Sequence, residues 1–278
     1  MNDVSHTLAQ ALHQAHTLGL ARIDAQLLLL HTLGRPDAGR AWLLAHDTDA
    51  LDDTLHAQFI ALCQRRAAGE PVAYLTGRKE FYGLPLHIDA RVLDPRPDTE
   101  TLVDWALEVL APLPAPRVVD LGTGSGAIAL ALQSQRPTAQ VWAVDASSDA
   151  LAVAQGNATR LGLPVRFEQG NWLAPMEGAS FDAIVSNPPY IASADPHLAA
   201  LTHEPLQALA SGADGLEDIR AIALQAPRHL APGGWLLLEH GYDQAEAVRG
   251  LLSAAGFSGV ESRRDLAGVE RCTGGCWR

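Results

Sequence analysis

The feature that most constrains the fold is an alternation of short apolar runs with helical patterns, which begins near residue 99 and continues to the end of the chain. Such alternation is typical of βαβ units, in which crossover helices join parallel strands. It predicts an α/β fold with a doubly wound, mostly parallel, seven-stranded sheet. Strands are expected at residues 117–120, 141–145, 165–168, 182–186, 235–239, 259–263 and 269–273, and helices at 99–110, 126–135, 148–161, 216–230 and 243–255.

The last two expected strands are separated only by residues 266–268. A parallel crossover needs about a dozen residues or more, so this connection is too short for one. We therefore expect these strands to form an antiparallel hairpin that is added to the sheet.

The part of the chain before residue 98 has a different pattern. Residues 1–70 are helical in periodicity, with helices expected at 6–18, 24–34 and 52–68 and with Asp24 as the N-cap of the second. They contain no phosphate loop or ligand cluster, so we interpret them as a small helical domain for substrate recognition. Glycines and prolines in residues 71–97 predict turns around short strands, and hence a linker with a β-hairpin. The α/β domain then covers residues 98–278.

Composition excludes several classes of protein. Hydrophobic residues make up 47% and charged residues 19%, which is enough to bury a core. No apolar run approaches the about 18 residues of a membrane span, and residues 1–20 lack the pattern of a signal peptide. The three cysteines do not form a disulfide framework, and the net charge of -12 argues against a general nucleic-acid binder. We expect a reduced, cytoplasmic, monomeric enzyme without direct nucleic-acid contacts.

A glycine-rich loop, Leu121-Gly-Thr-Gly-Ser-Gly126, directly follows the first expected strand of the sheet. Its glycines let the backbone approach a ligand closely and leave the N–H groups of the next helix free. Asp145 ends the following strand, where its carboxylate is placed to accept from both hydroxyls of a ribose. These residues predict an adenosine-type cofactor. They do not exclude a dinucleotide cofactor, because the loop also satisfies the glycine spacing of dinucleotide-binding motifs.

The turn Asn187-Pro-Pro-Tyr190 directly follows the apolar strand expected at 182–186. In an open α/β sheet the carboxyl end of this strand faces the same crevice as the glycine-rich loop. Two prolines make the turn rigid, so the Asn187 side-chain oxygen and the Pro188 carbonyl can present two acceptors to one NH2 group. Tyr190 adds a flat surface that can stack on a planar amide or base. A planar NH2 substrate beside an adenosine cofactor points to methyl transfer from S-adenosylmethionine.

Nearly the whole chain resembles one family, the release-factor glutamine methyltransferases (PrmC/HemK). The resemblance includes the glycine-rich loop and the Asn-Pro-Pro-Tyr turn, and it extends to several further motifs. These are Pro71-Val-Ala-Tyr-Leu-Thr-Gly77, Glu80-Phe-Tyr-Gly-Leu-Pro85, Pro95-Arg-Pro-Asp-Thr-Glu100, Glu204-Pro-Leu206 and Pro232-Gly-Gly-Trp-Leu-Leu-Leu-Glu-His-Gly241. The chain departs from the family in residues 195–204, which are short and contain Thr202-His203 where the family usually has Arg-Phe.

The resemblance implies a Rossmann-like methyltransferase domain, S-adenosyl-L-methionine as the cofactor, and peptide chain release factors as the protein substrate. The methylated atom is then the side-chain amide nitrogen of the glutamine in a Gly-Gly-Gln motif. The residues implied to bind the cofactor are Gly122, Thr123, Gly124, Ser125, Gly126, Asp145, Trp172 and Asn187. Asn187, Pro188, Pro189 and Tyr190 are implied to bind the substrate, with Asn187, Pro188 and Tyr190 as the catalytic residues and with no metal.

Three alternatives remain open at this point. The same turn suits an exocyclic amine of adenine in DNA or RNA, although the acidic composition argues against that substrate. An interaction protein that only senses the cofactor would not need an intact Asn187–Tyr190 turn. An NAD-dependent oxidoreductase would need an acid–base pair, for which the sequence offers no candidate.

Overall fold

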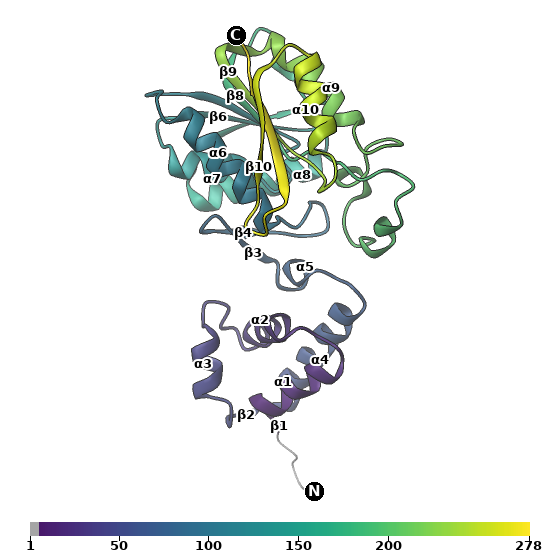
Figure 1. Cartoon of the computed structure of the whole chain (residues 1–278). Coiled ribbons are helices and arrows are strands. Elements are labelled where there is room, and N and C mark those ends of the chain that lie inside the picture. The colour runs from purple at the N-terminus through teal and green to yellow at the C-terminus, as the bar shows by residue number, and fades with distance from the viewer. Residues whose placement is uncertain (1–5) are drawn as a thin grey trace, which may run out of the picture. The chain divides into compact units, whose positions relative to one another are not determined.

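The structure is a computed structural model that describes residues 6–278. The chain divides into two compact units, Met1–Arg78 and Lys79–Arg278. The first unit is helical and the second is built around a sheet (Figure 1). Residues 1–5, with which the predicted helical domain begins, lie outside the described part of the chain.

The helical unit consists of short helices that bury their apolar faces against one another. Leu28, Leu29 and Phe59 are completely buried in this core. Thr7 caps the first helix, because its hydroxyl accepts a hydrogen bond from the Gln10 backbone N–H and the Gln10 side-chain oxygen accepts one from the Thr7 backbone N–H. The elements are β1 (His6–Thr7), α1 (Leu8–Thr17), α2 (Arg22–Thr32), α3 (Arg40–Ala45), β2 (Ala50–Leu51), α4 (Asp53–Ala67) and α5 (Val72–Thr76).

Two local expectations for this region were wrong, and one helix was missed. Helix α2 begins at Arg22, so Asp24 lies in its first turn instead of capping it, and the Asp24 carboxylate pairs with Arg66 Nε at 2.7 Å. The short helix α3 was not expected. Residues 72–76 lie in the segment for which only turns and short strands were expected, but they form helix α5, which ends at Gly77, whose φ of +67° favours glycine.

The second unit contains a seven-stranded sheet in the order β10-β11-β9-β8-β5-β6-β7. Strands β5 to β9 are parallel, and β11 pairs antiparallel with both β9 and β10. The doubly wound α/β fold and the closing antiparallel hairpin are therefore confirmed. The strands are β5 (Arg117–Leu121), β6 (Gln140–Asp145), β7 (Val165–Gln169), β8 (Phe181–Ser186), β9 (Leu230–Glu239), β10 (Ser258–Arg264) and β11 (Glu270–Cys276).

Helices α6 and α7 lie together on one face of the sheet, and α9 and α10 lie on the other (Figure 1). The helix expected at 216–230 divides near Pro227, which lacks an N–H, into α9 and a 3-10 turn over Ala226–Arg228. Outside the sheet, β3 (Arg78–Phe81) and β4 (Leu84–His87) form a hairpin. The helices are α6 (Glu100–Leu110), α7 (Ala127–Gln135), α8 (Ser148–Leu161), α9 (Glu217–Gln225) and α10 (Ala245–Ala254), with shorter 3-10 turns over Pro97–Thr99, Ala174–Met176, Pro196–Ala200 and Leu206–Ala208.

Buried side chains lock the central strands against these helices. Val119 of β5 and Ile184 of β8 pack in one cluster with Ile222 of α9 and Val248 of α10, and all four are completely buried. This packing holds the carboxyl ends of the parallel strands at one edge of the sheet. Within residues 6–278, no helix combines the length and the apolar character needed to cross a bilayer.

Candidate active site

The two turns that carried the functional predictions begin side by side. Leu121 of β5 is paired with Ser186 of β8, so the glycine-rich loop and the Asn187–Tyr190 turn leave the sheet at neighbouring positions. A cavity of about 280 Å³ opens there. The predicted site residues that line it are Gly122, Gly124, Asp145, Trp172, Asn187 and Pro189.

The wall of this cavity has a close approach between Gly122 and the Trp172 ring. A Cβ atom added at Gly122 would lie 3.3 Å from that ring, and the φ of Gly122 is +68°. Trp172 itself has a φ of +50°, a left-handed conformation that is rare for a large side chain. Backbone strain of this kind clusters at ligand sites, where the surroundings hold it in place. The lining therefore suits a flat ligand that lies against exposed backbone and an indole ring.

Asp145 is held in one orientation by two backbone donors. Its Oδ2 accepts from Gly124 N at 2.9 Å and its Oδ1 accepts from Ser147 N at 2.9 Å. Each carboxylate oxygen keeps a further lone pair, so the group can accept from two more donors. A vicinal diol, such as that of a ribose, fits this donor requirement, and the residues present therefore fit an adenosine-type cofactor.

Thr123, Ser125 and Gly126 of the loop do not line the cavity but stabilise the conformation of the loop. The Thr123 hydroxyl is turned to Asp120, whose Oδ2 it contacts at 2.6 Å. A Cβ at Gly126 would meet the side chains of Leu130 and Ala154 at 3.1 and 3.2 Å, so this glycine permits helix packing. Burial raises the pKa of Asp120 to about 7.

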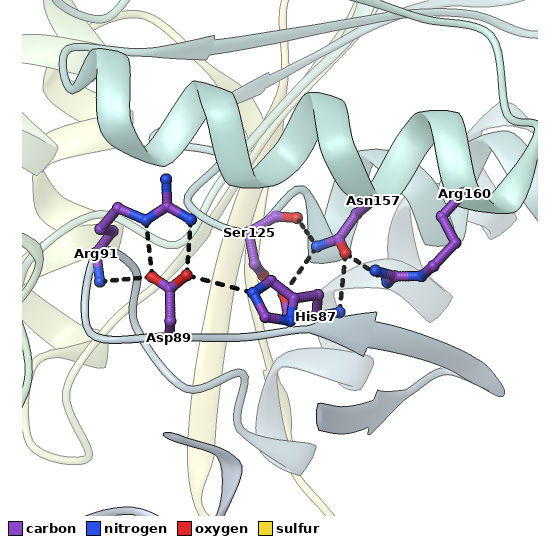
Figure 2. A network of polar contacts seen from close by, with 6 residues as sticks. All are labelled: His87, Asp89, Arg91, Ser125, Asn157 and Arg160. Atoms are coloured by element: carbon purple, nitrogen blue, oxygen red, sulfur yellow. Dashed lines mark hydrogen bonds and ion pairs between the residues drawn. The ribbon is translucent and has the colours of Figure 1, made fainter. Parts of the chain in front are cut away.

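Asn157 of α8 ties the loop to strand β4, as Figure 2 shows. Its Nδ2 donates to Ser125 O at 2.8 Å and to His87 O at 3.1 Å, while its Oδ1 accepts from His87 N at 2.8 Å. Arg160 adds a donor to the same oxygen at 2.6 Å. Ser125 thus contributes its carbonyl to a buried clamp.

The segment after β4 reaches the cavity at Arg91, Val92 and Leu93. Asp89 holds Arg91 through two side-chain hydrogen bonds of 2.9 and 2.7 Å (Figure 2). Hydrogen bonding from Arg91 lowers the pKa of Asp89 to about 2. The Asn157 clamp therefore positions two sides of the cavity together.

Asn187 also lines a second, smaller cavity of about 140 Å³. Tyr190 and Arg96 line this second cavity as well. Burial raises the pKa of Tyr190 to about 12, so its ring stays neutral, and its carbonyl accepts from Gln244 Nε2 at 3.0 Å. Pro188, the second residue of the turn, is buried. Asn187 is thus the residue of the turn that faces both cavities.

Several residues near the site were not assigned roles from the sequence. Asn187 Nδ2 donates to Thr99 Oγ1 at 3.3 Å. Arg96 Nη2 pairs with Glu204 Oε1 at 2.5 Å, and this pair connects the motif before α6 to the loop after the Asn187–Tyr190 turn. Glu239 lies buried at the end of β9. These four residues, Thr99, Arg96, Glu204 and Glu239, lie in motifs quoted for the family resemblance. Which residues they contact depends on the fold.

Comparisons with known proteins agree with this arrangement. Residues 99–216 match the family model described as the methyltransferase small domain, and residues 4–77 match the PrmC N-terminal domain. The release factor glutamine methyltransferase of Burkholderia pseudomallei is 49% identical over 99% of this chain and 99% of its own length. Those of Bordetella pertussis and Escherichia coli are 53% and 45% identical, over 92% and 98% of this chain and 95% and 98% of theirs.

Solved structures with low sequence identity share the fold over about 70% of the chain. The 16S rRNA N2 G1207 methyltransferase of T. thermophilus, in complex with AdoMet and guanosine, has a TM-score of 0.55 at 20% identity and covers 72% of this chain and 50% of its own. A methyltransferase from Pyrococcus furiosus has a TM-score of 0.53 at 19% identity and covers 70% and 88%. Since close similarity to the curated relatives extends over nearly the full length, the chain belongs to the release factor glutamine methyltransferase family.

Proposed function

We propose that the chain transfers a methyl group from S-adenosyl-L-methionine to the side-chain amide nitrogen of the glutamine in the Gly-Gly-Gln motif of peptide chain release factors. One observation carries this proposal beyond the family membership. Asn187 lines both the larger cavity, where the residues fit an adenosine cofactor, and the smaller cavity beside it. A group that faces both cavities is placed to hold a substrate amide next to the cofactor.

The larger cavity is proposed to hold S-adenosyl-L-methionine, which supplies an electrophilic methyl group on a sulfonium when bound. Gly122 and Gly124 leave the backbone open to its methionine end. Asp145 is proposed to accept from the two ribose hydroxyls, and Trp172 to lie near the adenine. Thr123, Ser125 and Gly126 support the shape of the loop through their packing and hydrogen bonds.

An amide nitrogen is a poor nucleophile because its lone pair is delocalised into the carbonyl. We propose that Asn187 Oδ1 and the Pro188 carbonyl accept the two N–H hydrogens of the substrate glutamine, with Pro189 keeping the turn rigid. These acceptors favour the positive charge that develops on the nitrogen, and Tyr190 stacks on the planar amide. Catalysis then depends on positioning at a near-attack distance, and the proton leaves after transfer, when it is acidic.

Substrate recognition is proposed for the helical residues 1–70, with 71–97 as the linker and 98–278 as the catalytic domain. The residues that line the two cavities at the Asn187 turn all lie beyond residue 90. A chain that begins at Lys79 should therefore still bind the cofactor in calorimetry but lose most activity on an intact release factor. Full activity of that shortened chain would contradict the assignment. Because release factors act in the cytoplasm, we propose that the enzyme does too.

The decisive experiment uses S-adenosylmethionine with a labelled methyl group and a purified release factor, and locates the label by mass spectrometry. The label is expected on the glutamine of the Gly-Gly-Gln motif and should be absent when that glutamine is replaced by alanine. A parallel reaction with adenine-containing DNA and RNA tests the alternative substrate. Label on adenine, without label on the release factor, would contradict the proposal.

A further inference from the structure

Glu239 is a buried carboxylate that the chemistry above does not use. It is 1% exposed and ends strand β9, and its Oε2 has no hydrogen-bond partner among the described residues. Strands β8 and β9 pair in parallel with Ser186 opposite Leu238. Asn187 directly follows β8 and Glu239 is the last residue of β9, so the register brings these two residues together at the site. Burying a carboxylate is costly, so its place beside Asn187 calls for a reason.

A short chain of hydrogen bonds connects the two residues. Asn187 Nδ2 donates to Thr99 Oγ1 at 3.3 Å. Hydrogen bonding from the side chains of Thr99 and Asn187 lowers the pKa of the Glu239 carboxyl group. A threonine hydroxyl has one proton, so it accepts from Asn187 and donates to Glu239. Thr99 Oγ1 and the Glu239 carboxylate are both acceptors for the Asn187 amide. The NH2 group of Asn187 is therefore favoured toward these two residues, and its Oδ1 points away from them.

We infer that Glu239 is a positioning residue: its carboxylate, directly and through Thr99, holds the NH2 group of Asn187 so that Oδ1 faces the substrate amide. This inference rests on the proposed function. If the Asn187 amide were inverted, its N–H donors would face a substrate NH2 group that also donates, and neither could be satisfied. Glu239 therefore selects the one orientation of Asn187 in which the turn can hold a glutamine.

The charge state of Glu239 follows from the elements packed around it. Burial raises the pKa of Glu239 to about 7, against the hydrogen bonds and the positive charge of Arg271 on β11, which lower it. Asp98, in the turn before α6, raises it. Tyr190 and Cys272 also interact with Glu239, and both stay neutral at this pH because their own pKa values are raised. Only the ionised carboxylate offers acceptors alone, so methyl transfer should slow as the pH falls through about 7.

The test is single-turnover methylation of a release factor at saturating cofactor, from about pH 5.5 to pH 8.5. The Glu239→Gln variant keeps the size but offers its own NH2 group to Asn187. Its rate at the upper end of this range should fall about ten- to a hundredfold, the scale of one hydrogen bond to a charged group. Its profile should also lose the fall near neutral pH. Thr99→Val should lower the rate as well, and the double variant should lose less than the product of the two.

The matched control is Glu270→Gln, which removes a half-buried carboxylate on β11 whose ion pairs are with Arg249 and Arg264. It should keep both the wild-type rate and the wild-type pH profile. Cofactor affinity, measured by calorimetry, should stay within about twofold for all variants, because Glu239 and Thr99 do not line the larger cavity.

A wild-type rate and profile in Glu239→Gln would overturn the inference. So would a loss of rate that is matched by a loss of cofactor affinity, or a slowed variant whose profile keeps its wild-type shape, since both indicate a merely structural role. The proposed function is tested separately in the same assay. If the wild-type enzyme itself fails to methylate the release factor, the proposed function fails, whatever the variants do.

Discussion

The glycine-rich loop after β5 and the Asn187–Tyr190 turn after β8 lie side by side, but different parts of the chain hold them. The loop is held mainly through its backbone and short side chains. Thr123 contacts Asp120, Gly126 N donates to Thr123 O at 2.8 Å, and Ser125 O accepts from Asn157 of α8 at 2.8 Å. The turn depends on distant residues, because Asn187 contacts Thr99 and the Tyr190 carbonyl accepts from Gln244.

This difference separates two ways of building a site. The loop offers backbone, so its share of cofactor binding is spread over several positions and depends on φ angles and close packing. The turn offers one side-chain amide, that of Asn187, and residues outside the turn set the orientation of this amide. We therefore expect single substitutions in the loop to have moderate effects on affinity or stability, and a substitution at Asn187 to act on turnover.

The largest effect is expected at Asn187. Asn187→Ala should lower the single-turnover rate by about 10²-fold or more, the scale for losing one well-placed polar group at a reacting centre. Calorimetry should find the cofactor affinity nearly unchanged, because the loop and Asp145 remain intact. Asn187→Asp keeps an acceptor but adds negative charge near the sulfonium, so it should bind the cofactor more tightly and transfer more slowly. Near-normal transfer by Asn187→Ala would make the turn structural.

The next effect is expected at Asp145, on affinity instead of rate. Asp145→Asn loses charge-assisted hydrogen bonds and should weaken cofactor binding by about 1.5–3 kcal/mol. The rate at saturating cofactor should change much less than it does in Asn187→Ala. Unchanged affinity in a calorimetric titration would remove Asp145 from the cofactor site.

Two glycines of the loop allow a matched comparison of stability. Both have positive φ, +54° at Gly124 and +84° at Gly126. A Cβ at Gly124 meets nothing within 4 Å, so Gly124→Ala should cost only the backbone strain, about 1 kcal/mol. A Cβ at Gly126 meets Leu130 and Ala154, so Gly126→Ala should cost at least about 2 kcal/mol. Denaturant unfolding measures both, and equal losses would contradict the packing role of Gly126.

The last prediction concerns the pH dependence of stability at Asp120. Because burial raises its pKa to about 7, the folded protein keeps this proton while the unfolded chain releases it near the ordinary pKa of 3.8. The wild type should therefore lose stability as the pH rises between these values, and Asp120→Asn should not lose that part. Thermal unfolding should be similar for both proteins near pH 4 and should increasingly favour Asp120→Asn toward pH 7. A constant difference across this range would show that Asp120 does not titrate there.

Much of the second unit was predictable because its signals are local. Strand β8 and helix α8 were expected at nearly their observed bounds, since apolar runs, periodicity and caps identify them. Asp24 shows where such reasoning fails. It has the chemistry of an N-cap, but a pairing with Arg66, on another helix, holds it inside the first turn. Competing long-range contacts outweigh a local preference of about 1 kcal/mol.

The sequence by itself determined the order of elements, the doubly wound sheet, the glycine-rich loop and the family, because periodicity, turn chemistry and motifs can be read along the chain. The tertiary structure decided what depends on neighbours in space. It places β11 between β9 and β10, where its middle residues are buried while β10 stays at the edge. It also brings Thr99 and Glu239 to Asn187. No local signal encodes these contacts, since each depends on how distant segments pack.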